Sequence, residues 1–172
     1  MSHINPAAAA AREHAREANG QFGCQQHSTP DVAPAEGPLT AGELDLAADH
    51  AEQALLWSSV DDDGVPFDQL GYDPAPQVRE YLRTELSDFC VKHADLVREA
   101  RERSNFSDSS FEEQFGHDYV LTAMRHGAGF WDRESLKQGG LGVRLTEAVQ
   151  QHSRLEYADL YEEDGEILLD HN

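Results

Sequence analysis

The sequence is short of basic residues. Its 13 Lys and Arg stand against 33 Asp and Glu, which gives a formal net charge of −20. Between Arg16 and Arg79 there is no Lys or Arg, although that span holds twelve Asp and Glu. After Arg154 there are seven more acids and again no Lys or Arg. Such a surface repels nucleic acid and anionic membranes and attracts basic proteins. We therefore expect no direct binding to nucleic acid and no membrane partner.

Long apolar runs and paired cysteines are also missing. No run approaches the roughly 20 residues that a membrane span needs, and the first residues, "MSHINPAAAAAREHAREANG", do not follow the pattern of a secretory signal. The two cysteines, Cys24 and Cys90, match no metal-binding spacing. These absences predict a cytoplasmic protein with reduced thiols.

Two helices are predicted between residues 39 and 105. "TAGELDLAADHAEQALLWSS" opens with Thr40 and Glu43 in the spacing of a capping box, and its apolar residues recur at helical intervals. A longer helix is predicted over residues 76–104, antiparallel to the first. Residues 1–38 are predicted to be an appendage, made of a helix after Asn5 and a linker.

From residue 106 onward the pattern predicts a small antiparallel sheet. Strands are expected at 118–124 and 129–132, joined by a tight turn in which Gly127 and Gly129 adopt positive φ. A covering helix then starts at Leu141, and a second hairpin turns at Asp164-Gly165. The predicted fold is α+β, with N-terminal helices packed on a β-β-α-β-β sheet.

Residues 39–172 are expected to form one domain, with a helical part at 39–105 and a sheet part at 106–172. The side chains predicted to fill its core are bulky and apolar. They are Leu55, Leu56, Leu82, Leu86, Phe89, Val97, Val120, Phe130, Leu145, Leu160 and Ile167, with Trp131 in the core or beside it.

The stretch "GHDYVLTAMRHGAGFWDR" concentrates residues that bind metals. His117, Asp118, His126 and Asp132 offer two imidazoles and two carboxylates to a divalent ion. On a hairpin, however, the two aspartates lie at the outer strand ends and His126 near the turn. We therefore favour a structural role and expect no cofactor and no catalytic residue. The alternative is a metal-binding module or enzyme that uses His117, His126 and Asp132.

Parts of the chain, spanning roughly residues 50 to 170, resemble an uncharacterised family of small acidic proteins from bacteriophages and other mobile elements. An HGAGFWDR-type motif is the most specific part of the resemblance, and "DYVLTA" stands where the family usually has "DFWLTR". The resemblance implies a phage or mobile-element setting, in a host cytoplasm, and no catalytic residue. The similar segments are "ALLWSSVDDDGVPFDQ" at 54–69, "GHDYVLTAMRHGAGFWDR" at 116–133, "LGVRLTEAV" at 141–149 and "ADLYEEDGEI" at 158–167.

The acids suggest a DNA mimic. Duplex DNA carries one negative charge per ~1.7 Å of helix axis, and carboxylates on helices and loops can approach that density. The partner would be a basic DNA-binding host protein, such as a restriction enzyme, CRISPR effector, nuclease or repressor, so that the protein acts as an anti-restriction or anti-CRISPR inhibitor. The predicted partner-binding residues are Asp45, Asp49, Glu52, Asp61, Asp62, Asp63, Asp68, Asp73, Glu162, Glu163 and Asp164.

The acidity is also compatible with salt adaptation or with simple solubility. Only two of the thirteen bases are Lys, and a high content of Asp and Glu with little Lys suits a salt-rich cytoplasm. Alternatively, the charge serves only the solubility of a phage interaction protein. The sequence also leaves open whether the protein is a homodimer.

Overall fold

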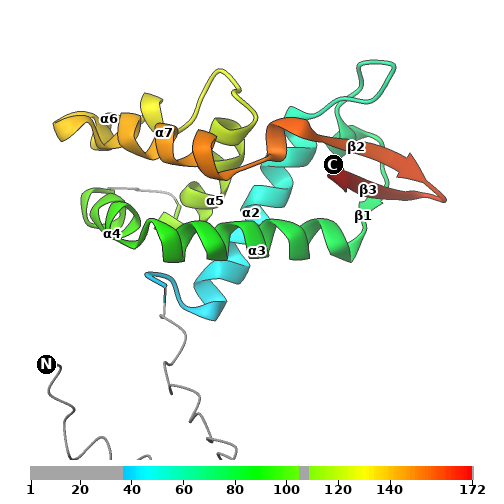
Figure 1. The fold of residues 1–172 in the computed structure, drawn as a ribbon. Coiled ribbons are helices and arrows are strands. Elements are labelled where there is room, and N and C mark those ends of the chain that lie inside the picture. Colours follow the sequence, from blue (N-terminus) through cyan, green and yellow to red (C-terminus); the bar gives the residue numbers. More distant parts are fainter. Residues whose placement is uncertain (1–36, 105–108, 172) are drawn as a thin grey trace, which may run out of the picture. The chain divides into compact units, whose positions relative to one another are not determined.

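The computed structural model describes residues 37–104 and 109–171, which lie within one compact unit, Ala35–Asn172 (Figure 1). Most of these residues are helical, and a small three-stranded sheet completes the unit. The fold is therefore α+β, as predicted. The helix predicted after Asn5 lies outside the described residues. Within the described ranges, no helix combines the length and the apolar character needed to cross a membrane.

Helix α2 (Ala41–Ser58) begins at the predicted capping box. The Glu43 carboxylate accepts the Thr40 N–H at 2.6 Å, and Thr40 Oγ1 accepts the Glu43 N–H at 3.4 Å. This reciprocal pair satisfies two amides that the first helical turn leaves without partners. The buried face of α2 is rich in alanine, which lets a neighbouring helix approach closely.

That neighbour is α5 (Phe111–Ala123), and its contact with α2 centres on a glycine. A Cβ atom added to Gly116 would overlap the backbone carbonyl of Ala47. The absence of a side chain at Gly116 therefore sets how closely the two helices pack.

The helix predicted over residues 76–104 is two helices, α3 (Pro76–Lys92) and α4 (Ala94–Arg103). They divide at His93, whose φ of −118° and ψ of 34° are not helical. The change of direction lets α4 bury Val97 and Ala100 in the same core that receives Phe89 from α3.

The predicted hairpin at 118–132 is wrong. Residues 118–123 belong to α5, and Phe130–Asp132 form a single 3₁₀ turn, η2. A short apolar run does not by itself separate a buried strand from a buried helix, and Ser110 with Glu113 forms a second capping box that starts α5. The short helix α6 (Glu134–Lys137) and then α7 (Leu141–His152) follow, the latter where a helix was expected.

The role predicted for Gly127 and Gly129 is also wrong. Neither has a φ in the left-handed region, and Gly129 is extended at φ 162°. Gly129 instead permits a close approach, because a Cβ there would collide with Thr122 Oγ1 and the ring of Trp131.

The sheet has the order β1-β3-β2, with β1 at Asp73–Pro74, β2 at Ala158–Glu163 and β3 at Glu166–His171. The β2–β3 hairpin is confirmed, and it turns at Asp164 and Gly165, whose φ values of 53° and 85° suit a two-residue turn. Strand β1 runs parallel to β3. The predicted β-β-α-β-β topology is therefore wrong. The residues predicted to form its first hairpin are helical instead, and strand β1 comes before α3 in the chain.

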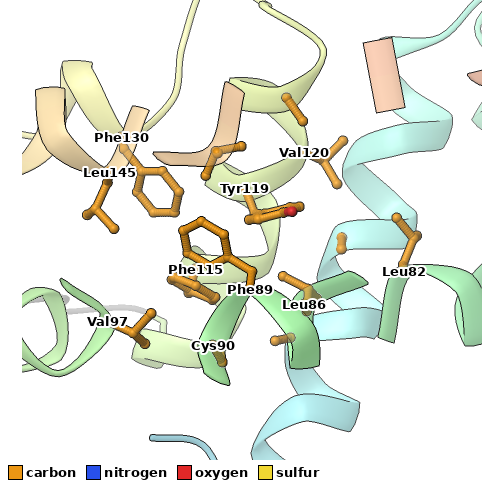
Figure 2. Packing of buried hydrophobic residues seen from close by; sticks show 14 of the residues in the cluster. Leu82, Leu86, Phe89, Cys90, Val97, Phe115, Tyr119, Val120, Phe130 and Leu145 are labelled. Carbon is orange, nitrogen blue, oxygen red and sulfur yellow. The ribbon is translucent and has the colours of Figure 1, made fainter. Parts of the chain in front are cut away.

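The core lies between the helices, and Figure 2 shows Phe89 beside Phe115 and Tyr119. The rings of Phe89 and Tyr119 meet edge to face at 5.1 Å between centroids. Three predicted core positions are only partly buried, namely Leu56, Trp131 and Leu160. The remaining predicted side chains are buried: Leu55, Leu82, Leu86, Phe89, Val97, Val120, Phe130, Leu145 and Ile167.

Candidate acidic binding surface

Pairing of β1 with β3 joins two acidic segments that are far apart in the sequence. Asp73 of β1 lies opposite Glu166 of β3, so the loop before β1 lies against the β2–β3 hairpin (Figure 1). We name residues 59–74 together with residues 158–170 the acidic lobe. The first segment contains five acids and the second six, and neither contains a Lys or Arg.

The lobe carboxylates are not paired with bases in the part of the chain that the structure describes. None of them forms an ion pair with another described residue. In the helices, by contrast, many acids form ion pairs with Arg side chains. Arg101 of α4, for example, binds the carboxylates of both Glu43 and Glu112. The uncompensated negative charge is therefore concentrated in the lobe.

Within the sheet, acids face acids. The register sets Asp159 opposite Asp170, and Glu166 opposite both Glu163 and Asp73. Like charges in directly opposed positions destabilise a strand pair. The hairpin thus retains charges that cost it stability, as functional surfaces commonly do.

One lobe acid also shapes the loop. Asp61 Oδ1 accepts the N–H groups of Asp63 and Val65 at 3.0 and 2.8 Å. This side-chain bonding closes the turn that contains Gly64, whose φ is 79°. The neighbouring side chains of Asp62 and Asp63 are exposed as a result of the turn's position at the surface.

The lobe and its margins also expose large apolar and aromatic side chains. Eight such residues are exposed in the described part of the chain, and six of them lie at 57–72 or 157–161. They are Trp57, Val60, Val65, Tyr72, Tyr157 and Tyr161. Aromatic residues are enriched at protein interfaces, so this surface differs from a merely solvated one.

A cleft of about 440 Å³ opens within the lobe. Both segments of the lobe contribute to its walls, which combine apolar, aromatic and acidic side chains. The lining residues are Val60, Asp61, Asp62, Phe67, Leu70, Tyr72, Leu160, Tyr161 and Glu162.

The predicted partner-binding residues divide into two groups. The acids of the loop and the hairpin all fall in the lobe, whereas Asp45, Asp49 and Glu52 lie on α2. The lobe group comprises Asp61, Asp62, Asp63, Asp68, Asp73, Glu162, Glu163 and Asp164. The hairpin register adds Asp159, Glu166 and Asp170 to this group.

The α2 acids are neutralised or partly buried. Arg83 Nε lies 2.6 Å from Asp45 Oδ1, and Arg79 forms an ion pair with Asp49. The hydrogen bond from Arg83 lowers the pKa of Asp45. Burial raises the pKa of Glu52, against a smaller opposite effect of Arg79. Asp45 and Asp49 therefore hold α2 to α3 and add little to a free anionic surface.

Two of the four metal-ligand candidates, Asp118 and His126, have other partners. Asp118 is buried against Arg133, and His126 Nε2 lies 2.9 Å from the carbonyl oxygen of Ser58. His117 Nδ1 is 3.6 Å from Asp118, and Asp132 is exposed in η2. Among the residues that the structure describes, no group of three or more His, Cys, Asp and Glu is placed to hold a metal ion.

Comparisons of the chain with protein-family models, with curated proteins and with solved structures find no match. A functional proposal therefore rests on the chemistry of the acidic lobe.

Proposed function

We propose that this protein is a non-enzymatic inhibitor that binds a basic, DNA-handling protein of its host cell through the acidic lobe. The observation that carries the proposal is the coincidence, within the acidic lobe, of eleven acids, no Lys or Arg, and the exposed side chains of Val60, Val65, Tyr72 and Tyr161. The carboxylates would occupy the place of DNA phosphates, and the aromatic residues would contribute contact area.

Electrostatics favours this kind of partner. A surface that grips DNA presents Lys and Arg toward phosphates, and the same charges attract the unpaired carboxylates of the lobe. Electrostatic attraction of this kind accelerates association, and it weakens as the salt concentration rises. A nucleic acid or an anionic membrane would instead be repelled.

The alternatives fit the lobe less well. Salt adaptation and general solubility are served by acids spread over the whole surface, and neither explains why exposed Tyr and Val side chains gather among them. Opposed acids such as Asp159 and Asp170 also destabilise the sheet. A binding role gives both features a purpose.

The bacteriophage resemblance suits this function, because a phage protein in the host cytoplasm benefits from blocking a restriction enzyme, CRISPR effector, nuclease or repressor. That setting stays a prediction, and no catalytic residue is assigned.

The test is capture of the partner by tagged full-length protein from host lysate at low salt, with elution along a salt gradient and identification by mass spectrometry. The decisive variant is D61N/D62N/D63N, in which an asparagine at position 61 retains the side-chain oxygen that accepts the loop N–H groups. The matched control, D88N/E102Q/E147Q, removes three exposed acids outside the lobe.

We expect a DNA-binding protein to be captured by the wild type and the control, to be lost with the lobe variant, and to be released by competing duplex DNA. Capture that is equal for all three proteins, or that DNA does not reduce, would overturn the proposal. Thermal melting of each variant checks that folding is retained.

A further inference from the structure

We propose that the cleft of the acidic lobe receives an arginine side chain of the partner. This inference rests on the proposed function for the nature of the partner, but the cleft's chemistry can be tested separately. The cleft measures about 440 Å³ and lies between the loop that precedes β1 and strand β2.

Its walls combine a buried apolar side chain with two partly exposed aromatic side chains. Phe67 is 2% exposed, whereas Tyr72 and Tyr161 are each 43% exposed. The two tyrosines come from different segments of the lobe, and both line the cleft. A guanidinium group is attracted to the face of an aromatic ring, and the apolar residues suit the three methylene groups of an arginine stem.

Carboxylates contribute from both segments. Asp61 and Asp62 lie in the loop, and Glu162 lies in β2. The hydrogen bonds that hold two of them use one oxygen each: Asp61 Oδ1 accepts loop N–H groups, and Glu162 Oε1 accepts the Gly165 N–H at 2.9 Å. The backbone thus fixes these carboxylates before a ligand arrives, which reduces the entropy lost on binding.

Charge complementarity commits the cleft to a cation. Apart from its two tyrosines, the titratable side chains that line the cleft are three acids. The lobe contains no Lys or Arg that could place its own side chain in the cleft. An exposed apolar recess with this rim would repel an anionic ligand and would gain little from a neutral one.

Arginine fits better than lysine. The guanidinium plane can stack on a tyrosine while its N–H groups bind carboxylates on either side, whereas lysine offers a compact, strongly hydrated charge. Arginine is also frequent on surfaces that bind phosphate groups, which is the partner chemistry of the proposed function.

The experiment compares two end-blocked peptides of equal charge, nona-arginine and nona-lysine, by calorimetric titration of the full-length protein at fixed salt. The cleft variant is Y72A/Y161A, and Y72L/Y161L keeps apolar bulk without the aromatic faces. Y157A is the control, because Tyr157 is 66% exposed but does not line the cleft.

We expect the wild type and Y157A to bind nona-arginine about fivefold more tightly than nona-lysine. Both cleft variants should lose this preference while their affinity for nona-lysine stays unchanged. Equal affinities for the two peptides with the wild type, or a preference that survives in Y72L/Y161L, would overturn the inference. Those results would leave the acidic lobe as a surface for basic proteins. Conversely, the protein could prefer nona-arginine to nona-lysine without capturing a DNA-handling protein. That result would overturn the proposed function but would support the cleft as an arginine site.

Discussion

Arg133 binds both carboxylate oxygens of Asp118. Its Nε lies 2.6 Å from Oδ2, and Nη2 contacts Oδ1, which also accepts a hydrogen bond from Gln114 Nε2 at 2.7 Å. Asp118 is 1% exposed. Because Asp118 lies on α5 and Arg133 precedes α6, the pair closes the loop that contains the "HGAGFW" run. The motif that resembled a metal site thus holds a helix and its following turn together.

Removing one member of this pair should destabilise the fold strongly. R133Q leaves the Asp118 carboxylate buried without its countercharge, and we expect a loss of about 3–5 kcal/mol in the free energy of unfolding. Urea unfolding followed by circular dichroism measures it. R98Q is the control, because Arg98 pairs with exposed Asp95 and such surface pairs contribute less than about 1 kcal/mol. Equal effects of the two changes would contradict this assignment.

Two glycine-to-alanine changes should have opposite effects. In G116A the new Cβ would overlap the Ala47 backbone, so we expect a loss of about 3 kcal/mol or more. In G42A the new Cβ meets no atom within 4 Å, and alanine favours the first turn of α2, so a gain of about 0.5 kcal/mol is expected. Thermal melting compares the two variants, and similar melting temperatures would refute the close crossing of α2 and α5.

Strong local signals were sufficient for several elements. The capping box of Thr40 and Glu43 placed α2, and the Asp164-Gly165 pair placed the β2–β3 turn, since positive φ at both residues is what such a turn requires. These features are decided within a few residues of chain.

The elements and contacts that were not predicted either depend on residues far apart in the sequence or have local sequence patterns that were not used. The sequence alone assigned no role to Gly116, because that role is set by Ala47 on another helix. Ser110 and Glu113 formed a capping box that could have identified α5. Arg79 and Arg83 are four residues apart, as are two acids on α2, Asp45 and Asp49. This matching spacing could have predicted the ion pairs between α2 and α3.

The composition of the acidic lobe could be predicted only in part. The acids of the loop and the hairpin were visible as separate charge runs. Their union depends on β1, a two-residue strand whose partner, β3, lies near the other end of the chain. Strand pairing over such a separation leaves no local pattern, so the cleft between the two segments was not predicted.

Cys90 should be chemically inert in the folded protein. Burial raises the pKa of its thiol to about 12, so very little reactive thiolate forms near neutral pH. In a C24S variant, which leaves one cysteine, we expect a thiol reagent at pH 8 to react roughly 100-fold more slowly with folded protein than with urea-unfolded protein. Rapid reaction without denaturant would contradict the packing of α3.

Acid should destabilise the fold through His93, at the junction of α3 and α4. Burial lowers the pKa of His93, with smaller contributions from Lys92 and His152. Its ring packs on Phe89 at 4.7 Å between centroids, and Nε2 is buried without a hydrogen-bond partner in the described residues. In the unfolded chain this side chain titrates near pH 6.5. As the pH falls through that value, the unfolded state binds a proton that the folded state resists.

The contribution of neutral His93 to stability is therefore complete above about pH 6.5 and declines below it, until the pH reaches the lowered pKa of the folded state. Between pH 7.5 and pH 5.5, the melting temperature should fall less for H93Q than for the wild type, because a glutamine side chain cannot take up the proton. H50Q is the control, since His50 has the Glu113 carboxylate 3.5 Å from its Nε2 and is not on the α3–α4 junction. If H93Q and the wild type lose stability equally between the two pH values, His93 is not the group that responds to acid.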